Sequence, residues 1–253
     1  MYKALSGVLG LLMLLSPSST CAAGTTAEVP AQVWSFKGLF GTFSRPSLQR
    51  GYQVYNEVCA GCHGLRLVAY RNLAEIGFSE KQVKKIAASM TVKDGPNDEG
   101  EMFERPGRSS DRFVSPFPNK QAARSANNGA YPPDLSLIVK ARIGGADYLY
   151  SLLTGYKEPK KVTEVPEGMY YNLYYPGQLI AMPSPLSEDG VEYADKTKAT
   201  VDQMARDVTT FLAWTAEPEL ESRKRTGVKV LLFLIILTGM LYAVKRKIWA
   251  NIH

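Results

Sequence analysis

Cys59-Ala60-Gly61-Cys62-His63 is the stretch of this 253-residue chain that decides its fold. Two cysteines three positions apart, with a histidine directly after them, form the pattern for covalent attachment of a c-type haem. In a helical stretch the positions i, i+3 and i+4 lie on one face, so both thiols and the imidazole can meet one flat cofactor. The thiols add to the two porphyrin vinyl groups while the imidazole binds the iron from the same side. We therefore predict one haem c, attached through Cys59 and Cys62, with His63 as an axial ligand.

The residue inventory disfavours other uses of this motif. A structural zinc site needs four ligands, but the remaining cysteine and histidine are Cys21 and His253, near opposite ends of the chain. A disulfide across two residues is strained. A thioredoxin-like redox pair needs a preceding strand and alternating strands and helices, which the sequence does not indicate.

Methionine is the expected sixth ligand, because a thioether is typical of electron-carrying cytochromes and raises the reduction potential. Met182 is favoured by its setting, since Pro183 and Pro185 exclude a helix and fix an extended loop that can present the sulfur. The alternative for Met182 is an ordinary gap-filling methionine, and Met169 is the next candidate ligand. The other methionines are Met1 and Met13 in an expected signal, Met240 in an expected membrane span and Met204 in a helical core stripe, with Met90 and Met102 left open.

Both ends of the chain carry apolar runs that predict export and anchoring. Residues 1–23 resemble a secretory signal peptide, with Lys3, an apolar run and then small residues, and Cys21 leaves a lipoprotein alternative open. The uncharged run 230–244 is apolar on all sides and, with its neighbours, long enough to span a membrane. We expect a signal peptide at 1–23, an exported haem domain at 24–222, an anchor with flanking basic clusters at 223–247 and a cytoplasmic tail at 248–253.

The net charge of +6 belongs to the chain ends and not to the exported domain. Eight of the 30 basic residues lie in the signal or from Arg223 onward, whereas all 24 acidic residues lie between. The exported domain therefore holds 22 basic and 24 acidic residues, a net charge of −2. Nucleic acid is not expected as a partner.

The predicted fold is mostly α, a cytochrome c-like haem domain with long irregular insertions and one C-terminal transmembrane helix. A helix over 48–58 leads into the motif, with Ser47 as its cap and Leu48, Tyr52 and Tyr55 on one side. Four more helices are expected at 79–89 with a Ser79/Gln82 capping pair, at 134–143 and 147–156 around Gly144-Gly145, and at 200–216.

Met182 follows His63 by 119 positions, more than a minimal haem domain needs, which suggests added surface for partners. The loop 93–105 holds five acidic residues between glycines and prolines. Two interpretations stay open: a solvated loop, or an acidic patch that steers a basic electron-accepting protein.

Six further stretches surround the motif: WSFKG at 34–38, LQRGYQVY at 48–55, NNGAYPPDLS at 127–136, KARIGGADY at 140–148, LLTGY at 152–156 and IAMP at 180–183. Together with the single anchor between two basic clusters, they resemble the cytochrome c1 family in its alphaproteobacterial form. That family supplies the haem c subunit of the cytochrome bc1 complex. The resemblance covers nearly the whole chain after the expected signal.

The resemblance implies roles at matching positions. Met182 falls where the family has its axial methionine. Arg142 and Tyr148 match residues that meet a haem propionate, and a guanidinium suits a buried carboxylate. Asn127 and Pro133 match residues that pack near the haem.

The resemblance also implies a function and partners. The chain would pass one electron at a time from a Rieske iron–sulfur protein through its haem to a soluble or membrane-bound cytochrome c. It would perform no chemistry of its own, but act within a ubiquinol:cytochrome c oxidoreductase beside cytochrome b, in a complex expected to be dimeric. Its place would be a bacterial inner membrane, crossed once, with the haem domain in the periplasm.

Two other functions compete with this one. A free-standing, membrane-tethered shuttle cytochrome would need only a compact haem domain on a flexible linker, which the long insertions disfavour. A haem enzyme or sensor such as a peroxidase needs an open iron position and usually a distal acid–base group, and no exported histidine remains for that role.

Overall fold

The computed structural model describes residues 27–159 and 164–250. The expected signal peptide and its cleavage site, and the end of the expected tail, lie outside the described residues. The helices are α1 Arg45–Val54, a π-helical turn Tyr55–Cys59, a 3-10 helix Tyr70–Ile76, α2 Glu80–Ala88, α3 Lys120–Ala126, α4 Ile138–Ala141, α5 Gly145–Thr154, α6 Val201–Ala216 and α7 Leu220–Trp249. The short strands form two antiparallel pairs, β1 Thr91–Asp94 with β2 Phe103–Pro106 and β3 Tyr170–Tyr171 with β4 Leu179–Ile180. The prediction of a mostly helical chain with one long apolar C-terminal helix is confirmed.

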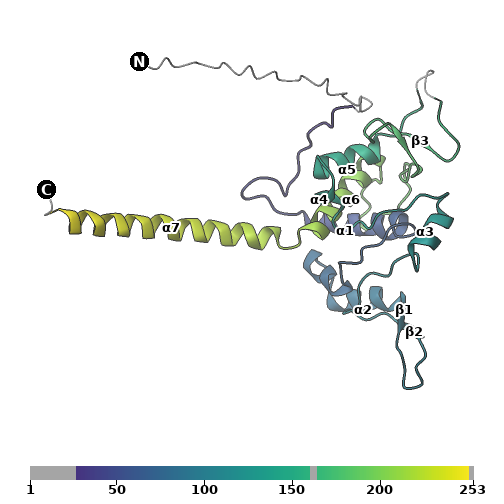
Figure 1. The fold of residues 1–253 in the computed structure, drawn as a ribbon, viewed down its shortest axis with the longest axis horizontal. Coiled ribbons are helices and arrows are strands. Elements are labelled where there is room, and N and C mark those ends of the chain that lie inside the picture. Colours follow the sequence, from purple (N-terminus) through teal and green to yellow (C-terminus); the bar gives the residue numbers. More distant parts are fainter. Residues whose placement is uncertain (1–26, 160–163, 251–253) are drawn as a thin grey trace, which may run out of the picture.

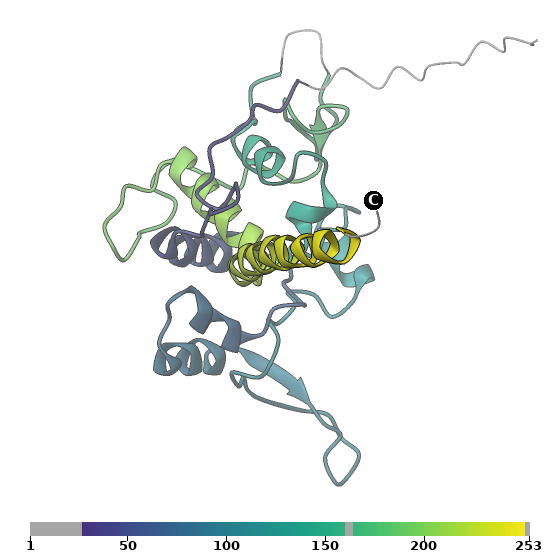
Figure 2. The ribbon, with the colours of Figure 1, turned by 90° about the vertical axis from the view of Figure 1, so that its left-hand side faces the viewer.

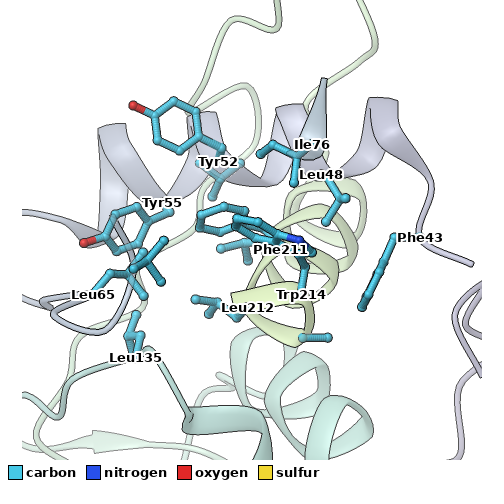
Figure 3. Close-up of a cluster of buried hydrophobic side chains, with 14 of the residues drawn as sticks. Phe43, Leu48, Tyr52, Tyr55, Leu65, Ile76, Leu135, Phe211, Leu212 and Trp214 are labelled. Atoms are coloured by element: carbon cyan, nitrogen blue, oxygen red, sulfur yellow. The ribbon is translucent and has the colours of Figure 1, made fainter. Parts of the chain in front are cut away.

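The core forms where α1 crosses α6, and its side chains are shown in Figure 3. The predicted stripe of Leu48, Tyr52 and Tyr55 is buried there, as expected. The ring of Phe211 lies 5.9 Å from the rings of both tyrosines, in the geometry favoured by aromatic pairs. Gly51 makes this approach possible, because a Cβ at that position would lie 2.1 Å from the carbonyl oxygen of Asp207. The helix that leads into the haem motif is therefore fixed against the centre of the domain.

The start of α1 differs from the prediction. The helix begins at Arg45, three residues earlier than expected, with Pro46 in its first turn, where the fixed backbone angle of proline suits a helix start. Ser47 is therefore inside the helix and does not cap it. Its hydroxyl instead donates to Asp207 Oδ1 on α6, at 2.5 Å.

The segment after the motif forms a separate lobe, seen below α1 in Figure 2. Its helix α2 begins with the predicted capping pair: Ser79 Oγ accepts from the backbone of Gln82, and the Gln82 side chain accepts from the backbone of Ser79. The acidic loop, expected without strands, is the tip of the β1–β2 hairpin. Arg105 ties the base of this hairpin to Asp94 and Asp111. The tip is exposed, which suits both a solvated loop and a docking patch.

The predicted helix over 134–143 is wrong for most of its length. Only Ile138–Ala141 is helical, because the preceding residues make contacts with the haem motif that hold them in an extended turn. The next helix, α5, begins at Gly145, so the break falls at Gly144, whose left-handed backbone (φ 86°) suits glycine.

The last two helices agree with the predictions. Thr200 caps α6 by accepting from the backbone of Gln203, and Met204 is fully buried as expected. The final helix α7 leaves the domain and projects alone (Figure 1). At 1.5 Å per residue its 30 residues extend about 45 Å, enough to cross a bilayer. Its apolar side chains are exposed along that length.

Candidate functional site

The motif continues the last turn of α1 without a break. Residues Tyr55–Cys59 form a π-helical turn, and the backbone N–H of Ala60 donates to the carbonyl of Tyr55 at 2.8 Å. The N–H groups of Cys62 and His63 then both donate to the carbonyl of Cys59, at 3.1 and 2.9 Å. These are the i−3 and i−4 bonds of a helix, so the two thiols and the imidazole leave one turn of backbone.

Both thiols of the motif are free, and Cys59 is unsuited to redox exchange. Burial raises the pKa of the Cys59 thiol to about 12, and the neighbouring Cys62 raises it further. A catalytic redox cysteine has a lowered pKa, typically at a helix N-terminus. Cys59 instead ends a helix. The environment of Cys59 therefore disfavours a thioredoxin-like pair.

His63 is held at its ring and at its backbone. Its Nδ1 lies 2.7 Å from the carbonyl oxygen of Pro133, and the Tyr55 hydroxyl donates to the His63 carbonyl at 3.0 Å. Burial lowers the pKa of His63, against opposing effects of Pro133 and Asp134. A neutral ring that donates from Nδ1 keeps the lone pair of Nε2 free for a metal.

Asp134 holds the segment that carries Pro133 against the motif. Its carboxylate accepts from the backbone N–H groups of Arg66, at 2.9 Å, and Ser136, at 3.0 Å. The N–H of Leu135 donates to the carbonyl of Gly64 at 2.9 Å. These bonds explain why the residues before α4 are not helical, and they fix the acceptor of the His63 ring.

Met182 lies in the loop directly after β4, and its backbone is held by Tyr156. The Tyr156 hydroxyl donates to the Met182 carbonyl at 3.1 Å, and burial raises the pKa of this phenol well above its usual range, so it remains a donor. Fully buried Asn172 ties the β3–β4 pair to the end of α5, with its side-chain amide donating to the Leu152 carbonyl at 2.8 Å. The loop of Met182 is therefore attached to a rigid part of the domain.

Arg142 and Tyr148 lie near each other, and Tyr148 lies near Tyr156, the residue that holds Met182. Burial raises the pKa of Tyr148, the charge of Arg142 opposes that rise, and Tyr148 in turn affects Tyr156. Arg142 is exposed and forms no ion pair with a carboxylate among residues 27–159 and 164–250. Its guanidinium is available to an anionic group.

The predicted site residues thus fall into two groups. Cys59, Cys62 and His63 lie with Pro133, whereas Arg142 and Tyr148 are connected to Met182 only through Tyr156. Asn127 ends α3, where its side chain donates to the Ala123 carbonyl at 2.7 Å. Within the described parts of the chain, no hydrogen bond joins Met182 or Asn127 to His63.

The residues present fit a haem better than a bare metal ion. Within the described ranges, no three side chains of histidine, cysteine, aspartate or glutamate gather as a metal cluster would require. One imidazole, two free thiols, a loop thioether and an unpaired guanidinium suit the iron, vinyl groups and propionates of one porphyrin. Four large apolar side chains that lie close to these residues in the sequence are exposed, and such side chains suit contact with an apolar macrocycle: Leu67, Tyr131, Leu137 and Ile143.

Sequence reasoning missed three residues that shape the site. Tyr55 was assigned to the core by its position on the helix, but the direction of its hydroxyl was not evident. Asp134 and Tyr156 were recognised only as parts of family stretches. The sequence did hold a signal for Asp134. An aspartate often accepts a hydrogen bond from the backbone N–H two residues later, which here belongs to Ser136. Nothing in the sequence indicated the bond from Tyr156 to Met182.

Known proteins similar to this chain agree with the chemistry of the site. A family model described as the Cytochrome C1 family matches residues 34–252. Cytochrome c1 of Rhodospirillum rubrum is 51% identical over 87% of this chain and 87% of its own length. A mitochondrial cytochrome c1 haem protein of Saccharomyces cerevisiae is 50% identical over 94% of this chain and 79% of its own. The protein named cytochrome b/c1 of Bradyrhizobium diazoefficiens is 51% identical over 96% of this chain, which spans only 39% of that relative.

Proposed function

This chain belongs to the cytochrome c1 family, and from that premise we propose that it is the electron-transfer subunit of a respiratory or photosynthetic bc1 complex. In this role it accepts single electrons from a Rieske iron–sulfur protein and delivers them to a cytochrome c. Cytochrome b is its partner in the membrane, and the complex is a dimer. The proposal is supported above all by the motif turn, where two thiols leave the same turn of backbone as an imidazole whose Nδ1 lies 2.7 Å from the Pro133 carbonyl oxygen.

The residues that hold the cofactor follow from the two groups. Cys59 and Cys62 form the thioethers, and His63 Nε2 and the Met182 sulfur are the axial ligands. Arg142 and Tyr148 meet a propionate, with Asn127 and Pro133 beside the ring, and one haem is bound per chain. When bound, haem supplies a reversible one-electron change at its iron. The task of the chain is to fix both ligands, exclude water from the iron and keep the cofactor near the protein surface.

The proposed location uses the two ends of the chain. Helix α7 anchors the chain in a bacterial inner membrane, and the head at 24–222 lies in the periplasm after removal of residues 1–23. The anchor occupies 223–247, and 248–253 lie in the cytoplasm. Exposed apolar side chains all around α7 from Val230 onward support a lipid environment for that part of the helix.

The test of the function is to isolate the tagged chain from gently solubilised membranes. Reduced-minus-oxidised spectra should show b-type haems beside haem c, and the preparation should reduce cytochrome c with quinol in a reaction that antimycin or stigmatellin stops. A single haem c without quinol activity would instead identify a membrane-tethered shuttle cytochrome.

Removing the motif thiols should remove the covalent bond in steps. We expect Cys62→Ser to retain one thioether, so haem stays with the denatured chain but its pyridine haemochrome band shifts to longer wavelength. The double variant Cys59→Ser/Cys62→Ser should release all haem into acidified acetone. Cys21→Ser, outside the motif, is the matched control and should change neither result. Full release of haem from Cys21→Ser would contradict the assignment.

Removing the hydroxyl of Tyr156 should loosen the Met182 loop while the protein stays folded. One lost hydrogen bond costs about 0.5–1.5 kcal/mol, so Tyr156→Phe should raise cyanide affinity of the ferric protein roughly two- to tenfold. It should also weaken the long-wavelength absorption band that reports iron–thioether bonding. Tyr170→Phe, at an exposed tyrosine of the same strand pair, is the control. Equal effects of the two variants would show that the bond to Met182 has no special role.

A further inference from the structure

The loop before α1 ends in an exposed apolar tip. Leu39 and Phe40 are 59% and 78% exposed, whereas the aromatic residues on either side of them are buried. Trp34 stacks on Phe36 with ring centroids 5.4 Å apart, and Phe36 packs on Phe43 at 5.0 Å. Hydrophobic side chains are therefore kept inside at the base of the loop and presented to the outside at its tip.

The loop is closed and rigid. The N–H of Thr42 donates to the carbonyl of Ser35 at 3.0 Å and so joins its two ends. Gly38 adopts a left-handed conformation (φ 79°), and a Cβ at Gly41 would lie 2.0 Å from the Lys37 carbonyl oxygen. The turn is therefore built to hold Leu39 and Phe40 outward in one defined conformation.

The loop is attached to the first turns of α7. Lys224 Nζ donates to the carbonyls of Phe36 and Gly41, at 2.7 and 3.0 Å. Glu221 accepts from the backbone of Phe43 at 2.8 Å and pairs with Arg45 at 2.9 Å. In Figure 1 the purple segment before α1 bulges from the domain on the side from which α7 leaves.

These contacts set the height of the loop relative to the uncharged part of α7. Lys224 precedes Val230, the first residue of that part, by six positions, or about 9 Å along a helix. The headgroup layer on each side of a bilayer is about 5–8 Å thick. The base of the loop therefore lies at the outer edge of that layer, and the segment before α1 runs alongside the first turns of α7 (Figure 1).

We propose that Leu39 and Phe40 insert into the lipid headgroup layer beside α7 and fix the domain on the membrane surface. The inference rests on the proposed anchoring of α7 but not on electron transfer. Exposed Leu and Phe on a rigid loop are the side chains that enter this layer. Two basic residues on the first turns of α7 are exposed and suit anionic headgroups: Arg225 and Lys229.

The distribution of aromatic residues along α7 supports lipid rather than protein as the occupant. Spanning helices are enriched in tryptophan and tyrosine at both membrane surfaces. At its far end α7 has Tyr242 and Trp249, but from Leu220 to Leu241 its sequence contains neither residue type, and Phe233 is its one aromatic residue there. Phe40 adds a second aromatic ring at that end. A protein interface buries about 800 Å² per partner, far more than a tip of two side chains offers.

The experiment measures the depth of single spin labels in the full chain, purified with its complex and reconstituted in phosphatidylcholine–phosphatidylglycerol vesicles. Labels are placed by Phe40→Cys, by Glu99→Cys at the exposed tip of the β1–β2 hairpin, and by Ile236→Cys inside α7. Relaxation by oxygen, which concentrates in lipid, is compared with relaxation by a water-soluble nickel chelate. We expect the oxygen-to-nickel ratio at Phe40→Cys to be several-fold higher than at Glu99→Cys and closer to that at Ile236→Cys.

Three results would overturn the inference, and they differ from one another. A ratio at Phe40→Cys equal to that at Glu99→Cys, with Ile236→Cys in lipid, would show that the tip faces water. Shielding of Phe40→Cys from both reagents would show that a protein such as cytochrome b covers it. Exposure of Ile236→Cys to nickel would show that the anchoring proposal itself fails. Leu39→Cys repeats the measurement if the Phe40 variant does not assemble.

Discussion

Replacing Met182 by leucine should lower the midpoint potential of the haem by a few tenths of a volt. A thioether favours reduced iron, and axial ligands together set haem potentials over a range of about 0.8 V. Leucine has nearly the volume of methionine, so the half-buried site stays packed and only the ligand is lost. The bond from Tyr156 holds the main chain of Met182 and is unaffected by this change. A redox titration of the α band measures the shift.

The same variant should admit external ligands. With an open position at the iron, carbon monoxide should bind the reduced protein rapidly, whereas the unchanged chain should exclude it. Met169→Leu is the matched control, since Met169 is the next candidate and is also half-buried, just before β3. If Met182→Leu kept both its potential and its resistance to carbon monoxide, Met182 would not be the ligand. Loss of both properties in Met169→Leu would transfer the role to that residue.

The haem motif could be predicted from the sequence because all of its geometry is local. Cys59, Cys62 and His63 are joined by bonds to one carbonyl, so their spacing alone places them together. The orientation of the ring was not predictable in the same way. It depends on Pro133, 70 residues further along the chain. Only the resemblance to a family pointed to that residue.

Elements whose local signals act alone were predicted well, and those that tertiary contacts control were not. The helix after Ser79 begins with the predicted capping pair, and the helix predicted at 200–216 begins within one residue of its predicted start. The segment 134–137 has helical periodicity, but Asp134 uses its carboxylate to hold the backbone of the motif loop. Those long-range bonds outweigh a weak helix propensity. Likewise, Ser47 resembled a cap but serves as a donor to Asp207.

Replacing Asp207 by alanine should cause the largest loss of stability in the domain. Its carboxylate is fully buried between α1 and α6. Arg50 donates to it through Nε at 2.7 Å and Nη2 at 3.1 Å, and Gln203 donates at 2.9 Å. The hydrogen bond to Asp207 is the main reason that the pKa of Arg50 is raised. Removing one partner of a buried ion pair costs about 3–5 kcal/mol, because the other charge loses its compensation.

We expect a loss near the lower limit, about 3 kcal/mol, because Arg50 keeps its second partner, Asp195, at 2.8 Å. For a chain of this size each kcal/mol lowers the melting temperature by roughly 2–4 °C, so the decrease should be about 6–12 °C. Far-UV circular dichroism of the full chain in mild detergent measures it. Alanine favours helix more than aspartate does, so weaker helix propensity in α6 cannot account for the loss.

Asp195→Ala separates the buried charge from the exposed one, since both aspartates bind the same arginine. The Asp195 side chain is 44% exposed, and an exposed pair contributes at most about 1 kcal/mol. The Asp195→Ala variant should therefore melt within about 4 °C of the unchanged protein.

Equal losses of stability in the two variants would show that the stabilisation comes from the charge of Arg50 and not from the buried carboxylate. A selective loss in Asp207→Ala would show that the contact between α1 and α6 depends on this carboxylate. Because α1 leads directly into Cys59, the same variant should also lose its iron–thioether absorption band at a lower temperature than Asp195→Ala.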